Sequence, residues 1–126
     1  MRKLYILALL FIVACNSSIN KENLIGKWNY QNYEYTNKSI QEPLANIQEQ
    51  KPAIVFYANG KAEIYSSGKI LSHGTFYLEN KIIRYEEVLD NGIKRKIPFL
   101  IKELDENQLI FETMEAPVKR ITAIKK

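Results

Sequence analysis

Cysteine, histidine and tryptophan occur once each in this chain of 126 residues, and glycine occurs only five times. A single cysteine cannot form an intramolecular disulfide, so the folded domain must be held together by its core alone. The single histidine, His73, cannot supply a two-histidine metal site, and one imidazole without a nearby nucleophile is a poor start for a catalytic triad. The sequence also lacks a glycine-rich phosphate loop and any metal-ligand spacing. We therefore expect no enzyme, no metal and no cofactor.

The N-terminus combines a basic start with a short apolar run. Eleven uncharged residues, Leu4 to Ala14, follow Met1-Arg2-Lys3. A membrane-spanning helix needs roughly 20 apolar residues, so this pattern predicts a secretory signal peptide over residues 1–14. Ile12-Val13-Ala14-Cys15 resembles the lipobox of bacterial lipoproteins. The resemblance implies that Cys15 carries diacylglycerol and that the new amino terminus is acylated, for example with palmitate. Asparagine rather than aspartate at position 16 favours sorting to the outer membrane.

The charged residues predict no nucleic-acid partner. Arg2 and Lys3 leave with the signal peptide, which lowers the net charge from +4 to +2. Lys94-Arg95-Lys96 is interpreted as a solvated strand edge, and His73 as a surface or rim residue. Glu86 and Glu87 are neighbours on a predicted strand and must point to opposite faces, so they cannot act as a carboxylate pair. Residues 15–23 are predicted to form a lipidated, flexible tether, and residues 24–126 a single domain.

Strand-like runs alternate with turn residues throughout the domain. We expect about eight strands, over residues 25–36, 53–57, 61–65, 70–79, 82–89, 93–104, 109–114 and 118–124. Short connections force neighbouring strands to pair antiparallel. Closing the sheet, with the first strand beside the last, removes both bare edges. The predicted fold is therefore an all-β, antiparallel up-and-down β-barrel, whose interior holds packed side chains or one small ligand.

Local features of the strands lead to four further expectations. The spacing of aromatic residues changes phase between Tyr30 and Tyr33, which predicts a bulge near Gln31-Asn32 or a strand half-buried on both sides. Asn59-Gly60 predicts a hairpin with a type I′ turn. Gly74 indicates a bend or a close backbone approach. Residues 37–52 are expected to form a loop with one helical turn that covers an end of the barrel.

Three segments resemble a known family. Leu24-Ile25-Gly26-Lys27-Trp28 is similar to the Gly-X-Trp signature that opens the lipocalins and the lipocalin-like domains of Gram-negative lipoproteins, and residues 56–60 and 74–78 also resemble segments of that lipoprotein group. The resemblance implies a lipocalin-like barrel that Trp28 closes at the bottom. It also implies that an arginine from a late strand packs across the Trp28 ring, a role open to Arg120.

These features leave two functional hypotheses. In the first, a lipid-anchored lipocalin-like module of the outer membrane binds a small hydrophobic ligand. The residues expected to line its cavity are aromatic: Trp28, Tyr30, Phe56, Phe76, Phe99 and Phe111. In the second, these rings simply fill the barrel, and the domain is a protein-interaction or inhibitor module. The contact would then come from the aromatic strand 28–35 or from the loop 37–52.

Overall fold

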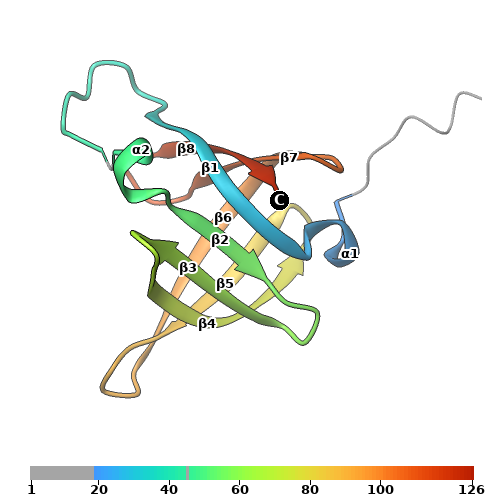
Figure 1. Cartoon of the computed structure of the whole chain (residues 1–126). Coiled ribbons are helices and arrows are strands. Elements are labelled where there is room, and N and C mark those ends of the chain that lie inside the picture. The colour runs from blue at the N-terminus through green and yellow to red at the C-terminus, as the bar shows by residue number, and fades with distance from the viewer. Residues whose placement is uncertain (1–18, 45) are drawn as a thin grey trace, which may run out of the picture.

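The computed structural model describes residues 19–44 and 46–126, so the predicted signal peptide, Cys15 and the start of the predicted tether lie outside the described residues. The described chain forms a closed barrel of eight antiparallel strands (Figure 1): β1 (Gly26–Tyr35), β2 (Ala53–Phe56), β3 (Lys61–Ser66), β4 (Lys69–Glu79), β5 (Ile82–Val88), β6 (Lys94–Leu104), β7 (Gln108–Thr113) and β8 (Lys119–Lys125). Each strand pairs with the next, and β8 pairs with β1. The predicted up-and-down barrel is confirmed, and each predicted strand end is correct to within one residue.

The change of aromatic phase in β1 is explained by the predicted bulge. The pairing of β1 with β8 shifts register between Tyr30 and Asn32, so Gln31 is an extra residue. An extra residue changes which side chains face inward beyond it. As a result, Tyr33 packs against the core cluster that contains Tyr30, and Tyr35 is also buried.

One end of the barrel is closed by the start of the chain. Asn20 caps the single helical turn α1 (Lys21–Leu24) through its side chain, and Leu24 is fully buried. Nε1 of Trp28 donates a hydrogen bond of 2.8 Å to the carbonyl of Leu24, which fixes α1 against the first strand. Residues 21–23, the last part of the predicted tether, belong to this capped turn beside the buried leucine. We call this the α1 end.

The cation over the Trp28 ring is Lys125, and the prediction for Arg120 is wrong. Lys125 pairs with Trp28 across β1 and β8, and its Nζ lies 5.3 Å from the ring centroid. A Cβ at position 26 would lie 2.6 Å from Cε of Lys125, so Gly26 leaves room for this side chain. Arg120 pairs with Glu34 much farther along β1, and it forms an ion pair of 2.8 Å with Glu112. Register therefore keeps Arg120 away from the tryptophan.

The turn between β2 and β3 differs from the prediction, whereas the close approach at Gly74 is confirmed. Residues 57–60 do connect β2 and β3, but Gly60 has a φ of 91° while Asn59 is not among the positive-φ residues, so the turn is not type I′. Positive φ at two successive turn residues occurs instead at Ser67 and Gly68, between β3 and β4. Gly74 does mark a close approach, because a Cβ there would lie 1.8 Å from the carbonyl oxygen of Glu86 on β5.

The opposite end of the barrel, which we call the mouth, holds the longer connections (Figure 1). It includes the 36–52 connection and the turns after β3, β5 and β7. The expected helical turn in the 36–52 connection is α2 (Ile47–Gln50), capped by Asn46; Ile40 and Leu44 precede it and are not helical. Ile47 packs against the core, and the carbonyl of Gln50 accepts a hydrogen bond from Ser67. Neither described helix is long and apolar enough to span a membrane.

Candidate functional site

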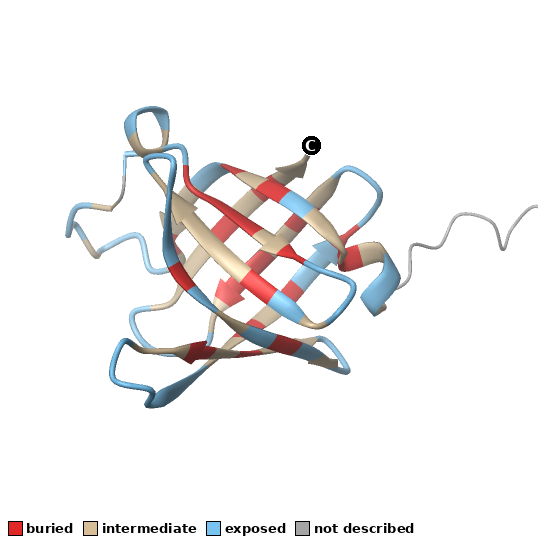
Figure 2. Cartoon of the chain, turned by 60° about the horizontal axis from the view of Figure 1, so that its bottom comes forward, coloured by how far each residue is buried: buried red, intermediate tan, exposed pale blue. Residues whose placement is uncertain are grey.

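The six aromatic residues predicted to line a ligand cavity all lie in the core, where they pack against one another. The centroids of Phe56 and Phe76 are 4.8 Å apart, and those of Phe99 and Phe111 are 5.3 Å apart. Tyr30 meets Phe111 edge-on at 6.0 Å. Trp28, Phe56 and Phe111 are at most 1% exposed. The buried positions run along the strands while the turns are exposed (Figure 2).

Two hollows in the described part of the chain lie outside this aromatic core. The larger, of about 450 Å³, is a groove over the outer faces of β4, β5 and β6. Its outward side chains include Thr75, Tyr77, Arg84, Glu86, Lys96 and Pro98. The smaller, of about 140 Å³, lies beside the turn between β7 and β8. None of the six predicted lining residues contributes to either hollow, so the structure does not bring them together around these spaces.

A chain of polar side chains lies inside the mouth half of the barrel. Glu87 is only 8% exposed. Its Oε1 lies 2.7 Å from Nη2 of Arg95 and accepts a hydrogen bond of 3.0 Å from Nε of the same side chain. Its Oε2 accepts the Ser72 hydroxyl at 2.6 Å, and Ser72 Oγ lies 2.6 Å from the hydroxyl of Tyr85. Buried glutamates are rare unless they are paired, and this one has a charged partner and a neutral one.

The directions of these hydrogen bonds follow from the protons available. An ionised carboxylate only accepts, so the single hydroxyl proton of Ser72 is donated to Glu87. Tyr85 must then donate to Ser72. Burial raises the pKa of the Tyr85 phenol, while the bond to Ser72 partly opposes that rise. The resulting series of hydrogen bonds runs from Tyr85 through Ser72 to Glu87. Arg95 binds Glu87 from the more exposed side.

Three phenols from β1 enter the same half of the barrel. Tyr30 and Tyr33 meet edge-on with centroids 6.2 Å apart, and Tyr35 follows two residues later. Burial raises the pKa of Tyr30 far above its ordinary value, and the neighbouring phenols of Tyr33 and Tyr85 add to this rise. Burial, followed by the nearby Tyr35, also raises the pKa of Tyr33. These groups therefore remain neutral hydroxyls at ordinary pH.

Strand alternation in the sequence carries a signal for the polar chain, although Ser72, Tyr85, Glu87 and Arg95 are not among the predicted site residues. Glu87 has the same strand phase as the buried Tyr85, and Arg95 has the phase of the buried residues of β6. The same alternation separates Glu86 from Glu87. The structure confirms that separation, because Glu86 lines the outer groove. It also confirms that His73 is exposed.

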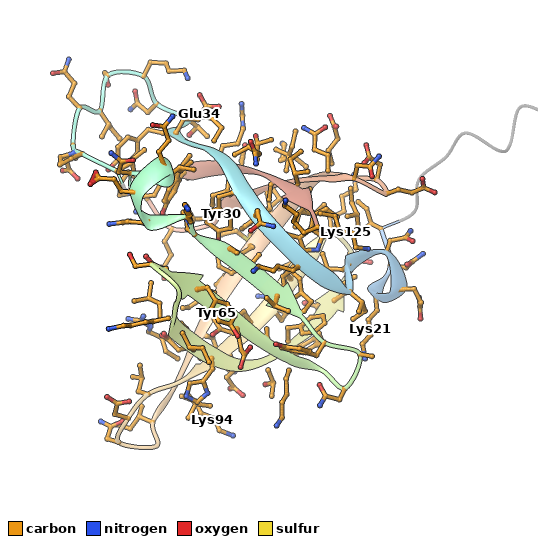
Figure 3. All side chains as sticks on the ribbon, viewed as in Figure 1. Lys21, Tyr30, Glu34, Tyr65, Lys94 and Lys125 are labelled. Atoms are coloured by element: carbon orange, nitrogen blue, oxygen red, sulfur yellow. The ribbon has the colours of Figure 1, made fainter. Side chains whose placement is uncertain are left out.

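The basic cluster of β6 is a solvated strand edge, as predicted. Lys94, Arg95 and Lys96 are exposed and pair with β5, whereas the pairing of β6 with β7 begins only at Phe99. The first part of β6 therefore has one side without a neighbouring strand. Lys94 lies near the turn between β5 and β6, far from Lys21 and Lys125 at the α1 end (Figure 3).

Exposed apolar side chains collect around the mouth. Six large hydrophobic residues are exposed in the described chain, and four of them lie in or next to mouth turns: Ile70 (50%), Leu71 (70%), Ile93 (59%) and Met114 (44%). We call these four residues the apolar rim. Of the other two, Tyr77 lies in the outer groove and Tyr57 follows β2 at the α1 end.

The outer surface carries two further polar clusters that we interpret as structural. Glu63 accepts the hydroxyls of Tyr57 at 2.7 Å and Tyr65 at 2.8 Å, and these bonds lower the pKa of its carboxyl. In the second cluster, Nζ of Lys38 donates a hydrogen bond of 2.8 Å to Glu34 and lowers the pKa of that carboxyl. The nearby Arg120 lowers this pKa further. Both clusters are solvated, so their contribution to stability is small.

No group of three or more His, Cys, Asp or Glu side chains in residues 19–44 and 46–126 is arranged to hold a metal ion. Compared with known protein families, with curated proteins and with solved structures, the chain matches none of them.

Proposed function

We propose that this protein is a lipid-anchored module of the cell envelope that binds a protein partner through the apolar rim. The exposure of Ile70, Leu71, Ile93 and Met114 at one end of the barrel carries the proposal. Single exposed apolar residues are ordinary, but several at one end of a small domain mark an interaction surface. Lys69 and Lys94 adjoin two of them, which favours a partner with carboxylates around an apolar centre.

The direction of the barrel is consistent with this role. The lipid anchor is proposed from the Met1 to Cys15 pattern, and the described chain enters the barrel through α1. The rim lies at the opposite end (Figure 1). An anchor at Cys15 would therefore leave the rim facing away from the anchoring bilayer, where it can meet a protein.

The packed interior supports this hypothesis over a roomy pocket for a hydrophobic ligand. The ring centroids lie 4.8 to 6.0 Å apart, so these rings pack against one another and present no free face to a ligand. A hydrophobic ligand would have to displace these contacts, each of which contributes about 0.5–1.5 kcal/mol beyond its buried area.

The proposal can be tested by photo-crosslinking in the cell envelope of the native host. A benzophenone amino acid is placed at Leu71 or Ile93 in the rim, and at Tyr57 at the α1 end as the matched control. We expect one discrete protein adduct from both rim positions and none from position 57. The adduct formed at Ile93 should disappear when Leu71→Asp is added, while circular dichroism stays unchanged. Adducts that are equal at the two ends, or that contain only lipid, would contradict the proposal.

A further inference from the structure

The first part of β6 is paired on one side only. Its pairing with β5 extends to Lys94, whereas its pairing with β7 begins at Phe99, opposite Thr113. Beyond Thr113, residues 114–118 lead away to β8. Residues 94–98 therefore form an edge without a second neighbouring strand in the described part of the chain, although the barrel as a whole is closed. We call this segment the β6 edge.

The hydrogen bonds of β6 show which backbone groups face the open side of this edge. The carbonyl of Ile93 and the N–H of Ile101 both form hydrogen bonds on the side of β5. In a regular antiparallel strand these directions alternate from one residue to the next, and the pairing of β5 with β6 has no shift of register. The backbone N–H and C=O groups of Lys94 and Lys96 therefore point to the open side. Both lysines are exposed.

Pro98 at the end of the β6 edge fits this arrangement. By the same alternation its nitrogen faces the open side, where proline has no N–H to donate. Within sheets, proline is confined to edges, strand starts and bulges. A strand added along the β6 edge would thus exchange its main-chain hydrogen bonds with Lys94 and Lys96.

The surroundings of the β6 edge are apolar at both ends. Ile93 of the apolar rim directly precedes it, and Met114 of the same rim lies beside its last residues. Ile97, Pro98 and Met114 line the hollow of about 140 Å³ next to the turn between β7 and β8. Ligand pockets usually measure about 300–1,000 Å³. The hollow therefore suits one apolar side chain of a bound strand instead of a separate ligand.

The charge of the β6 edge determines which strand fits it. Lys94 and Lys96 are two residues apart, so their side chains share the outer face, and Lys96 lines the outer groove. Arg95 between them is already bound to Glu87. Antiparallel pairing of two such edges would bring lysines of the two copies together, and like charges opposite each other are destabilising. A strand with carboxylates at alternate positions would instead match both lysines.

We propose that the β6 edge binds an extended acidic segment of the protein partner as an added antiparallel strand. Acidic residues of this segment lie opposite Lys94 and Lys96 and exchange backbone hydrogen bonds with them. The residue opposite Ile97 is apolar and enters the small hollow. Main-chain hydrogen bonds provide affinity in such a strand addition, and alternate side chains provide specificity. This inference rests on the proposed protein partner and specifies how that partner is recognised.

The test uses the full protein, ¹⁵N-labelled and in an uncharged detergent, with the end-blocked peptide Ser-Val-Glu-Val-Glu-Ser. We expect a Kd of about 0.1–1 mM by NMR titration. Bound peptide should slow hydrogen exchange at the amides of Lys94 and Lys96 but not at Arg95, whose N–H already faces β5. The peptide with lysine in place of glutamate should bind at least about 10-fold more weakly. No binding up to about 10 mM, or equal binding of the two peptides, would overturn the proposal.

N-methylation of the peptide separates strand pairing from simple attraction between charges. In an antiparallel pair, the residue opposite Lys96 directs its own N–H towards Lys96. Methylation of both glutamate nitrogens should therefore abolish binding. Methylation of both valine nitrogens, which face away from β6, is the matched control and should leave the Kd within about 3-fold. Any other pattern would refute the added antiparallel strand.

A charge reversal locates the site on β6. Lys96→Glu should raise the Kd of the glutamate peptide at least about 5-fold. Lys102→Glu makes the same change at an exposed residue in the part of β6 that pairs with β7, and it should leave the Kd within about 2-fold. An equal increase in both variants would refute the site.

The same variant distinguishes this inference from the proposed function. If the rim adduct in the crosslinking experiment persists unchanged in Lys96→Glu, the rim contact stands and the added strand is refuted. If the peptide binds as expected but no rim adduct forms in the cell envelope, the β6 edge stands as a site for acidic strands, and only the contact through the rim is contradicted.

Discussion

Replacing Gly74 by alanine adds a single methyl group where the backbones of β4 and β5 approach closely. Its Cβ would lie 1.8 Å from the carbonyl oxygen of Glu86, 2.8 Å from the carbonyl carbon and 3.0 Å from Cα of Glu87. All three are backbone atoms, so no side-chain rotation relieves the clash, and β4 and β5 must move apart. Overpacking of this kind costs about 1–3 kcal/mol.

The strand separation adds a second cost to the first. Gly74 pairs with Glu87, so the movement weakens neighbouring ladder hydrogen bonds, each of which contributes about 0.5–1.5 kcal/mol. It also strains the bond from Ser72 to Glu87. We therefore expect Gly74→Ala to lower the free energy of unfolding by about 3–5 kcal/mol. With a urea slope of about 2 kcal/mol/M, the unfolding midpoint should fall by ~1.5–2.5 M.

Gly92→Ala provides the control because it changes the same residue type without a clash. Gly92 has a φ of 84° and nothing lies within 4 Å of its added Cβ. Its cost is limited to the left-handed backbone, about 1–2 kcal/mol. Urea unfolding followed by circular dichroism compares the two variants. Equal midpoints would refute the reasoning, since the close approach would then contribute nothing beyond ordinary glycine strain.

Three further predictions concern the tryptophan, the phenols and the anchor. Trp28→Ala should lower the free energy of unfolding by about 3–5 kcal/mol, measured in urea, because the ring is fully buried and bonded to α1. The folded state holds the pKa of Tyr30 above 10.0, mainly by burial, so its contribution to stability is complete below pH 10.0 and is lost as the pH rises beyond it. Tyr30→Phe should flatten that alkaline loss in thermal melts from about pH 9 to 12. Cys15→Ser should abolish fatty-acid labelling and release the protein from membranes, and unchanged labelling would refute the anchor.

The strands and their order could be predicted because each depends on local pattern. Alternating side chains and short turns indicate where strands begin. Because an exposed sheet edge leaves backbone N–H and C=O groups unpaired, closure of the sheet is also predictable. The bulge at Gln31 was also predictable, since the aromatic residues on either side of it cannot otherwise share a face. Even the close approach at Gly74 follows from a glycine set among larger side chains in a strand.

What was not predicted depends on register and on pairs distant in sequence. Whether Lys125 or Arg120 meets Trp28 is decided by how β8 slides against β1, which a count of residues within one strand cannot give. The ion pair between Glu87 and Arg95 joins two strands across a hairpin. Each of these two residues is visible in the sequence, but their meeting depends on where the turn between β5 and β6 reverses the chain.

The extra residue in β1 lets aromatic side chains on both sides of it face the interior of the mouth half. If Gln31 stayed in the chain but took a regular place in the ladder, every side chain beyond it would exchange its side of the wall, because a one-residue slip reverses the faces of a strand. Tyr33 and Tyr35 would then point into solvent, and Glu34 would be forced among the buried rings. A single unpaired residue thus keeps two aromatic groups inside the cylinder and one charge outside it.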